Sequence, residues 1–109
     1  MLTFGSGSRL FLSNGPTDLR KGFEGLCILV ESMFQEQVIS NSYFIFLNRT
    51  RDRMKILYWD GDGLAIWIKR LEKGRFPKSK ENQPIITRRD FLMLLEGVVP
   101  HRFHKRYKA

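Results

Sequence analysis

Apolar and polar residues alternate with a period of two from Tyr43 to Phe76, and two short polar segments interrupt this alternation. A period of two places successive side chains on opposite faces of a strand. The interrupting segments, residues 48–52 and 60–63, are rich in Asn, Asp and Gly and are too short to join parallel strands. We therefore expect an antiparallel meander whose strands are residues 43–47, 53–59 and 64–71.

The second turn also predicts which side chains share a face. If Gly61, Asp62 and Gly63 form a three-residue loop with Gly63 in the left-handed region, Asp60 lies opposite Leu64. In this register one face is an apolar core face. The opposite face is aromatic in its middle and basic towards its edge, and it carries Phe44, Phe46, Trp59 and Trp67. A loop one residue longer would place Trp59 opposite Leu64 and mix the two faces.

Helical patterns flank the meander. Apolar residues recur at steps of three and four over residues 17–37, which predicts an amphipathic helix capped by Thr17, with an acidic solvent face. In a second helix, Thr87 is the expected cap, Asp90 occupies the N3 position and Gly97 is placed to end it. A short strand is expected at residues 9–12, before the turn that contains Gly15.

These elements predict an α+β fold, in which a small antiparallel β-sheet of about four strands packs with two α-helices. A length of 109 residues allows one core, so we expect a single domain over residues 1–109, with a flexible stretch at 1–8 and a basic tail at 98–109. The single cysteine, Cys27, excludes an internal disulfide. No secretory signal or membrane-spanning run is recognisable, so we expect a cytoplasmic protein with no membrane partner.

Basic residues outnumber acidic ones by 19 to 11, which gives a net charge of +8 and favours a polyanionic partner such as nucleic acid. Between residues 49 and 80 there are ten Lys or Arg residues and four Asp or Glu residues. The alternative is that these charges only solvate the surface. If they contact phosphates, binding should be sensitive to salt. The candidate DNA contacts are Arg49, Arg51, Lys69, Arg70, Lys73, Arg75, Arg88 and Arg89.

The tryptophans of the sheet and the acidic residues near its second turn each allow a functional and a structural interpretation. The tryptophans of the sheet could stack on unpaired bases, or they could pack with the neighbouring phenylalanines beneath the second helix or a partner. Asp60, Asp62 and Glu72 resemble a magnesium site, but Asp and Gly are also what a tight turn requires. We therefore expect no catalytic residue, no metal and no cofactor. The candidate partner-binding residues are Phe44, Phe46, Trp59 and Trp67.

Several runs of the chain resemble a known family. They are GPTDLRKGFEGL at residues 15–26, FIFLNR at 44–49, KILYWDGDG at 55–63 and KRLEKGRF at 69–76. In order and spacing they are similar to the small accessory protein, called TnpB or the second open reading frame, of bacterial IS66 insertion sequences. The resemblance extends from about residue 9 to residue 97. It implies a mobile-element protein needed for efficient transposition and encoded beside a larger transposase, which carries the catalytic acids.

The resemblance and the basic residues together predict a non-enzymatic DNA-binding accessory factor. Its expected partners are the DNA of the element ends and the transposase of the same element. The alternative is a protein-interaction adaptor that does not contact DNA. Such an adaptor would dock on the transposase, or form a homo-oligomer, through the four aromatic residues named above.

Overall fold

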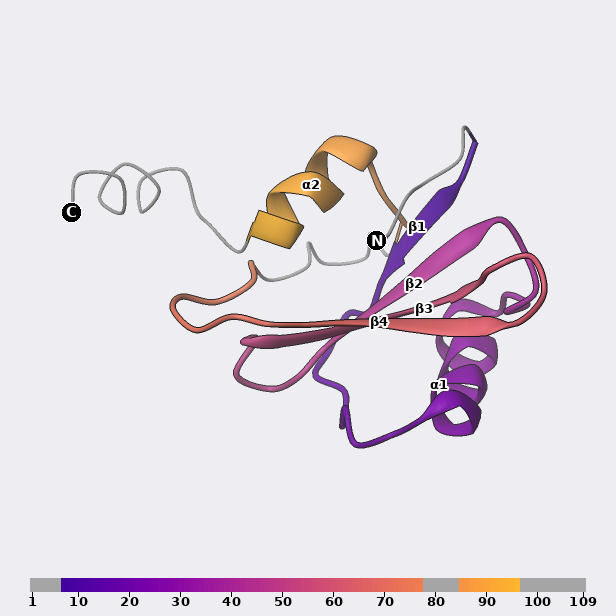
Figure 1. The fold of residues 1–109 in the computed structure, drawn as a ribbon, viewed down its shortest axis with the longest axis horizontal. Coiled ribbons are helices and arrows are strands. Elements are labelled where there is room, and N and C mark those ends of the chain that lie inside the picture. Colours follow the sequence, from indigo (N-terminus) through magenta and orange to yellow (C-terminus); the bar gives the residue numbers. More distant parts are fainter. Residues whose placement is uncertain (1–6, 78–84, 97–109) are drawn as a thin grey trace.

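The computed structural model describes residues 7–77 and 85–96, and the statements below concern these residues. They form one sheet with the strand order β4-β3-β2-β1-β5 and a helix on each face (Figure 1). This arrangement confirms the predicted α+β class. The strands are β1 (Arg9–Leu12), β2 (Ser42–Leu47), β3 (Arg53–Trp59), β4 (Leu64–Arg70) and β5 (Ile85–Ile86), and the helices are α1 (Phe23–Leu29) and α2 (Arg88–Glu96).

Strands β2, β3 and β4 form the predicted antiparallel meander, but the sheet as a whole is mixed. β1 runs parallel to β2, and β5 pairs antiparallel to β1 on its other side. Parallel neighbours need a long crossover connection, and residues 13–41, which include α1, supply it across one face of the sheet. The prediction of an antiparallel sheet was therefore wrong for the β1–β2 pair.

The first helix begins later than its apolar period predicted. α1 starts at Phe23 after Gly22, continues as a π-helical turn, Val30–Phe34, and ends where Gln35 adopts a left-handed conformation with φ of 54°. Thr17 does not cap it. The backbone N–H of Thr17 instead donates to the carbonyl of Leu47, at 2.8 Å, so this segment is held against the end of β2. Thr17 thus pairs with a residue thirty positions away in the sequence and does not take part in a helical turn.

The register of β3 and β4 also differs from the preferred prediction. Trp59 lies opposite Leu64, because the turn contains four residues and Gly61, with φ of 76°, takes the left-handed conformation predicted for Gly63. The backbone N–H of Asp60 closes this turn on the carbonyl of Gly63, at 2.8 Å. A shift of one residue moves every β4 side chain to the other face. Trp67 therefore does not share a face with Phe44, Phe46 and Trp59, and the prediction of one aromatic face was wrong.

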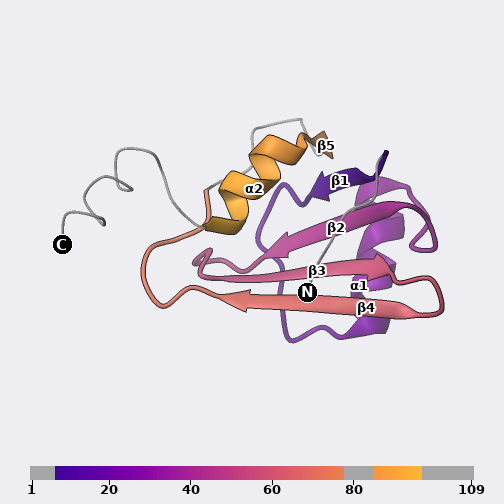
Figure 2. The same cartoon turned by 45° about the horizontal axis from the view of Figure 1, so that its top comes forward.

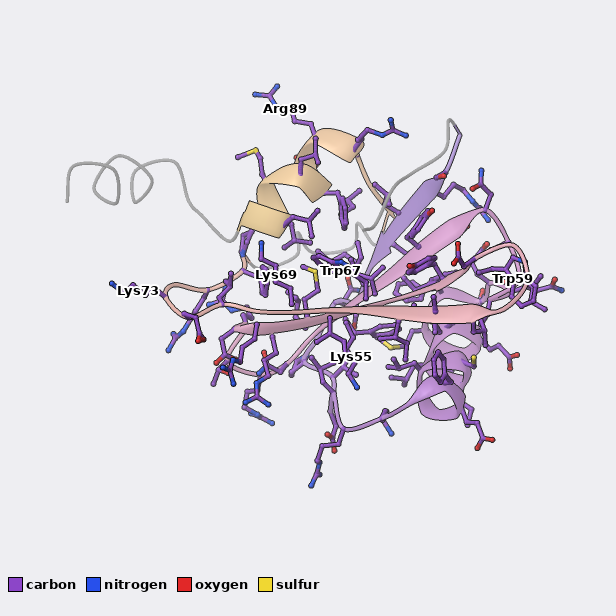
Figure 3. The ribbon with its side chains drawn as sticks, viewed as in Figure 1. Lys55, Trp59, Trp67, Lys69, Lys73 and Arg89 are labelled. Carbon is purple, nitrogen blue, oxygen red and sulfur yellow. The ribbon has the colours of Figure 1, made fainter. Side chains whose placement is uncertain are left out.

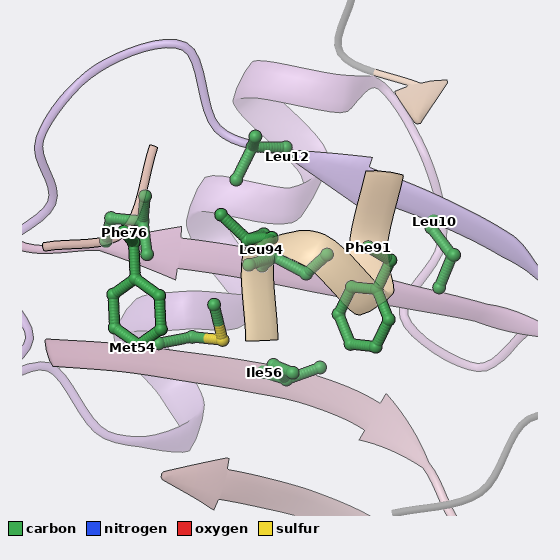
Figure 4. Packing of buried hydrophobic residues seen from close by; sticks show 9 residues of the cluster. Leu10, Leu12, Met54, Ile56, Phe76, Phe91 and Leu94 are labelled. Atoms are coloured by element: carbon green, nitrogen blue, oxygen red, sulfur yellow. The ribbon is translucent and has the colours of Figure 1, made fainter. Parts of the chain in front are cut away.

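A separate apolar core lies on each face of the sheet. Beneath α2 the buried side chains are Leu10, Leu12, Ile45, Leu47, Met54, Ile56, Phe76, Phe91 and Leu94 (Figure 4). Beneath α1 they are Phe11, Leu26, Val30, Val38, Phe44, Phe46 and Leu57. The rings of Phe11 and Phe44 stack across the parallel strands, with their centroids 5.2 Å apart. Phe44 and Phe46 are thus core residues beneath the first helix, and neither is accessible to a partner.

The start of α2 matches the prediction. The hydroxyl of Thr87 accepts a hydrogen bond from the backbone N–H of Asp90 at 3.1 Å, and Phe91 and Leu94 are buried against the sheet. Gly97, the expected end of the helix, lies outside the described residues, as do the basic tail at 98–109 and residues 1–6 of the expected flexible stretch. No helix in the described ranges is long and apolar enough to cross a bilayer.

We expect Phe46→Ala to lower the free energy of unfolding by about 3–5 kcal/mol, because it empties a fully packed site between β2 and α1. Phe23→Ala is the matched control. Its ring is 48% exposed, so its loss should cost less than about 1 kcal/mol. Urea denaturation at neutral pH measures both values, and equal costs would contradict the placement of the α1-side core.

Candidate nucleic-acid interface

The turn between β2 and β3 is held by the side chain of Asn48. Its Oδ1 accepts the backbone N–H groups of Asp52 at 3.1 Å and Arg53 at 3.0 Å. Its Nδ2 donates to the carboxylate of Asp52 at 2.7 Å, and the hydroxyl of Thr50 donates to the same oxygen at 2.7 Å. These bonds lower the pKa of Asp52. The hydrogen bond from Asn48 has the largest effect, and the bond from Thr50 has the next largest. The turn therefore presents exposed Arg49 on an ordered backbone.

The segment that follows β4 returns to this turn and is bonded to it. The backbone N–H of Leu71 donates to the carbonyl of Asp52 at 2.7 Å, and that of Phe76 donates to the carbonyl of Arg51 at 2.7 Å. The guanidinium of Arg51 in turn donates to the carbonyl of Phe76 at 3.1 Å, and the Phe76 ring is fully buried. Cations from both segments consequently lie at one end of the sheet. We call this region the basic end, and its residues are Arg49, Arg51, Arg53, Arg70, Lys73 and Arg75.

An open groove of about 520 Å³ lies beside the basic end. Residues 16–20 form one wall, and the β2–β3 turn with parts of β3 and β4 forms the other. Leu19 and the exposed Ile68 make its lining partly apolar. Four cationic side chains line it: Arg20, Arg49, Arg53 and Lys55. A groove of this composition suits an anionic ligand with an apolar or planar part.

The wall at residues 16–20 is itself fixed by polar contacts. The Asp18 carboxylate accepts Nε of Arg20 at 2.9 Å, Nη2 of Arg20 at 2.7 Å and the backbone N–H of Arg20 at 3.0 Å. These contacts with Arg20 hold the pKa of Asp18 well below its usual range. Nζ of Lys55 donates to the carbonyl of Lys21 at 3.1 Å, which ties β3 to the same wall.

The paired and unpaired cations of the groove differ in what they can offer a ligand. Arg20 is paired with Asp18. Across residues 7–77 and 85–96, Arg49 and Arg53 have no ion pair with a carboxylate. Both are exposed. These two guanidiniums can therefore bind a phosphate without giving up an ion pair with a carboxylate.

The structure brings together five of the eight predicted DNA contacts and separates the other three. Lys69 lies on the α2 side of the sheet and donates its Nζ to the carbonyl of Leu95, where a cation suits the C-terminal end of the helix dipole (Figure 3). Arg88 and Arg89 stand at the other end of α2, and Arg89 points away from the sheet. These three side chains therefore belong neither to the basic end nor to the groove.

Sequence reasoning missed three groove residues, Arg20, Arg53 and Lys55. Arg20 was missed because residues 17–21 were assigned to a helix. Pro16 and Gly22, which lie on either side of residues 17–21, could have indicated a loop there, because Pro and Gly are typical of turns and loops. Arg53 and Lys55 were counted in the local charge excess but were not selected, because the predicted contacts favoured the turn and the segment after β4.

The weak magnesium pattern is not assembled in the structure. Asp60 and Asp62 precede β4, whereas Glu72 follows it and pairs with Arg70 at 3.3 Å. Within the described ranges no three His, Cys, Asp or Glu side chains lie close enough together to hold a metal ion.

Most residues of the site lie in the runs that resemble the IS66 family, and comparison with known proteins bears on that resemblance. The family model described as "IS66 Orf2 like protein" matches residues 8–105. The chain belongs to this family. The match includes both walls of the groove and the entire basic end. Membership supports an accessory role associated with transposition of an insertion sequence.

Two relatives of this IS66 Orf2-like chain come from Sinorhizobium fredii. Uncharacterized protein y4hO is 30% identical over 100 residues, which cover 90% of this chain and 87% of the relative. Uncharacterized protein y4jC is 32% identical over 94 residues, which cover 84% of this chain and 80% of the relative. No solved structure matches the chain.

We expect Asp52→Asn to destabilise this IS66 Orf2-like protein in a pH-dependent manner. Because the folded pKa of Asp52 lies below its unfolded value of about 3.8, its contribution is complete above that value and is lost as the pH falls through the folded pKa. The difference in unfolding free energy between the two proteins should therefore shrink as the pH falls from about 5 towards 2. Urea titrations across this range measure it. A difference that stays constant would show that the hydrogen bonds of this turn do not discriminate between the charged and neutral carboxyl.

Proposed function

We propose that this accessory protein binds the DNA ends of its insertion sequence without catalysing a reaction, and that it thereby assists the transposase of the same element. One observation carries the proposal. Cations from two separate segments, namely the wall at residues 16–20 and the β2–β3 turn with β3, line one groove. The cationic segment after β4 is bonded to that turn beside the groove. Family membership supplies the biological context of this surface.

The electrostatics of the basic end suit a phosphate backbone. Double-stranded DNA carries one negative charge per about 1.7 Å of helix axis, so a cluster of guanidiniums can contact several phosphates at once. Of the carboxylates nearby, Asp18 and Glu72 each pair with an arginine and Asp52 bonds within its own turn. The acidic side chains of Glu24 in α1 and Glu31 in the π-helical turn do not line the groove.

The ordered backbone of the site adds to its suitability. Asn48 fixes the turn, and the bonds between Arg51 and Phe76 fix the returning segment. Binding of a ligand here costs little conformational entropy, because both segments are already held in one conformation. In this proposal the protein positions the element ends electrostatically, in the cytoplasm, and the transposase performs strand cleavage and joining.

We expect Arg49→Ala and Arg53→Ala each to weaken binding to a duplex that carries an element end. Each change should also reduce the slope of log affinity against log salt concentration by about 0.9, the value for one phosphate contact. Fluorescence anisotropy at several salt concentrations between about 50 and 200 mM measures both quantities.

Arg89→Ala is the matched control, since it removes the same charge at the far end of α2. It should leave the affinity and the slope near their wild-type values. Absence of binding at low salt, or an affinity that does not respond to salt, would overturn the proposal. An equal loss of slope for all three variants would show that net charge acts without a defined site.

A further inference from the structure

Strand β4 borders the described sheet on one side, and Figure 2 shows it at the edge away from β5. It pairs with β3 over all seven of its residues. On its other side no strand of the described ranges lies beside it. Its sequence, LAIWIKR, contains no Pro or Gly that would blunt an edge. A regular edge strand of this length is a template for a further strand.

The side chains of β4 leave apolar surface uncovered. Leu64, Ile66 and Ile68 alternate on the α1 side, and Ala65 and Trp67 alternate on the α2 side. None of the five is buried, and Ile68 is 62% exposed. On the adjacent strand β3, by contrast, Ile56 and Leu57 are fully buried. The two helices thus cover the centre of the sheet and not this edge.

Opposite charges stand at the two ends of β4. Asp60 and Asp62 precede the strand and are exposed. Arg70 ends it and pairs with Glu72, and the exposed Lys73 and Arg75 follow. Parallel pairing of two such strands would bring like charges together at both ends. Antiparallel pairing brings an acidic end to a basic end twice. The charge distribution along β4 is therefore complementary to that of a second copy in the antiparallel orientation.

We propose that two copies of this chain pair antiparallel through β4 to form one continuous sheet. The twofold axis of such a pair is perpendicular to the sheet, so each residue keeps its face in both copies. Residues directly opposite each other in antiparallel strands share a face. An even-numbered residue of β4 can therefore lie opposite only an even-numbered residue of the partner, and an odd-numbered one opposite only an odd-numbered one. In the register centred on Trp67, Ile66 lies opposite the partner's Ile68, and Leu64 lies opposite the aliphatic stem of the partner's Arg70.

This pairing accounts for the exposed features of the edge. It covers Ile68 and places Trp67 beside the partner's Trp67 on the α2 side. It also brings the loop that contains Asp60 and Asp62 close to the partner's Lys73. The inference does not depend on the proposed DNA binding, because self-association is measured without DNA.

Reversal of charge at either end of β4 tests the proposal, with sedimentation equilibrium of the full chain as the measurement. The wild-type chain should dimerise. Asp60→Lys with Asp62→Lys in one chain, and Lys73→Glu with Arg75→Glu in another, should each weaken self-association by at least about tenfold, because like charges then meet twice. An equimolar mixture of the two altered chains should dimerise again, because both ends of the mixed pair are complementary.

Ile68→Lys tests the apolar part of the seam. The side chain is largely exposed in the single chain, so the variant should unfold in urea like the wild type and yet remain monomeric. Ile39→Lys is the matched control. Its side chain is 64% exposed and lies outside β4, so this variant should dimerise normally. A wild-type chain that is monomeric at every concentration overturns the proposal. A dimer that persists in Ile68→Lys, or a mixture of charge-reversed chains that stays monomeric, also overturns it.

Discussion

Strands β2 and β3 carry buried apolar side chains on both faces, and the positions of the other elements follow from the need to cover both faces. Phe44, Phe46 and Leu57 must be covered on one side, and Ile45 and Ile56 on the other. Residues 7–77 and 85–96 meet this demand with one helix per face, which makes three layers out of a single sheet. The parallel β1–β2 pair follows from it, because the crossover that creates the pair is the same segment that carries α1 across the sheet. Surfaces for binding are left at the ends and edges of the sheet.

The basic end shows what core formation imposes on the surface. Closing the segment after β4 onto the β2–β3 turn brings Arg51, Lys73 and Arg75 towards one another, and repulsion between like charges opposes this closure. Burial of the Phe76 ring and the backbone bonds of Leu71 and Phe76 offset the repulsion. Solvent and salt screen most of what remains at such exposed positions. A polyanion that binds the basic end would reduce this repulsion further, so folding and the proposed binding favour the same arrangement of charges.

Sequence patterns predicted the strands well because alternation is a local property. The bounds of β1 and β3 are those expected, and those of β2 and β4 differ by one residue. The errors concern partners that lie far apart in the sequence or a geometry that one residue decides. Thr17 was placed in a helix because its apolar neighbours are periodic, but its N–H has a strand partner at Leu47. The turn at residues 60–63 fits two loop lengths, and the choice of Gly63 over Gly61 for the left-handed position reversed the faces of β4.

The same two errors limited the prediction of the site. The cations of the β2–β3 turn and of the segment after β4 lie together, as expected, because these short connections meet at one end of an antiparallel meander in either register. Lys69 was assigned to that group, and the observed register places it beneath the end of α2 instead. Arg20 was omitted because the helix assignment hid the loop that carries it. Charge counting thus finds a basic end, and only the pairing of the strands decides which cations belong to it.

The proposed DNA site and the proposed pairing meet at the end of β4, where Ile68 lines the groove and Lys73 belongs to the basic end. Arg49 and Arg53 lie outside the seam, so both contacts remain compatible with pairing. Arg49 lies on the β2–β3 turn, whereas pairing involves the far edge of β4. A twofold axis through the middle of β4 would direct the basic ends of the two copies in opposite directions. In the register centred on Trp67 the two Arg70 residues would lie six residues apart along the strands, about 20 Å, and the β2–β3 turns would lie farther apart. Partial neutralisation of Lys73 and Arg75 by the partner's Asp60 would leave Arg49 and Arg53 as the dominant phosphate contacts. In the proposed function, a pair of this kind would offer Arg49 and Arg53 of each copy to a separate DNA end.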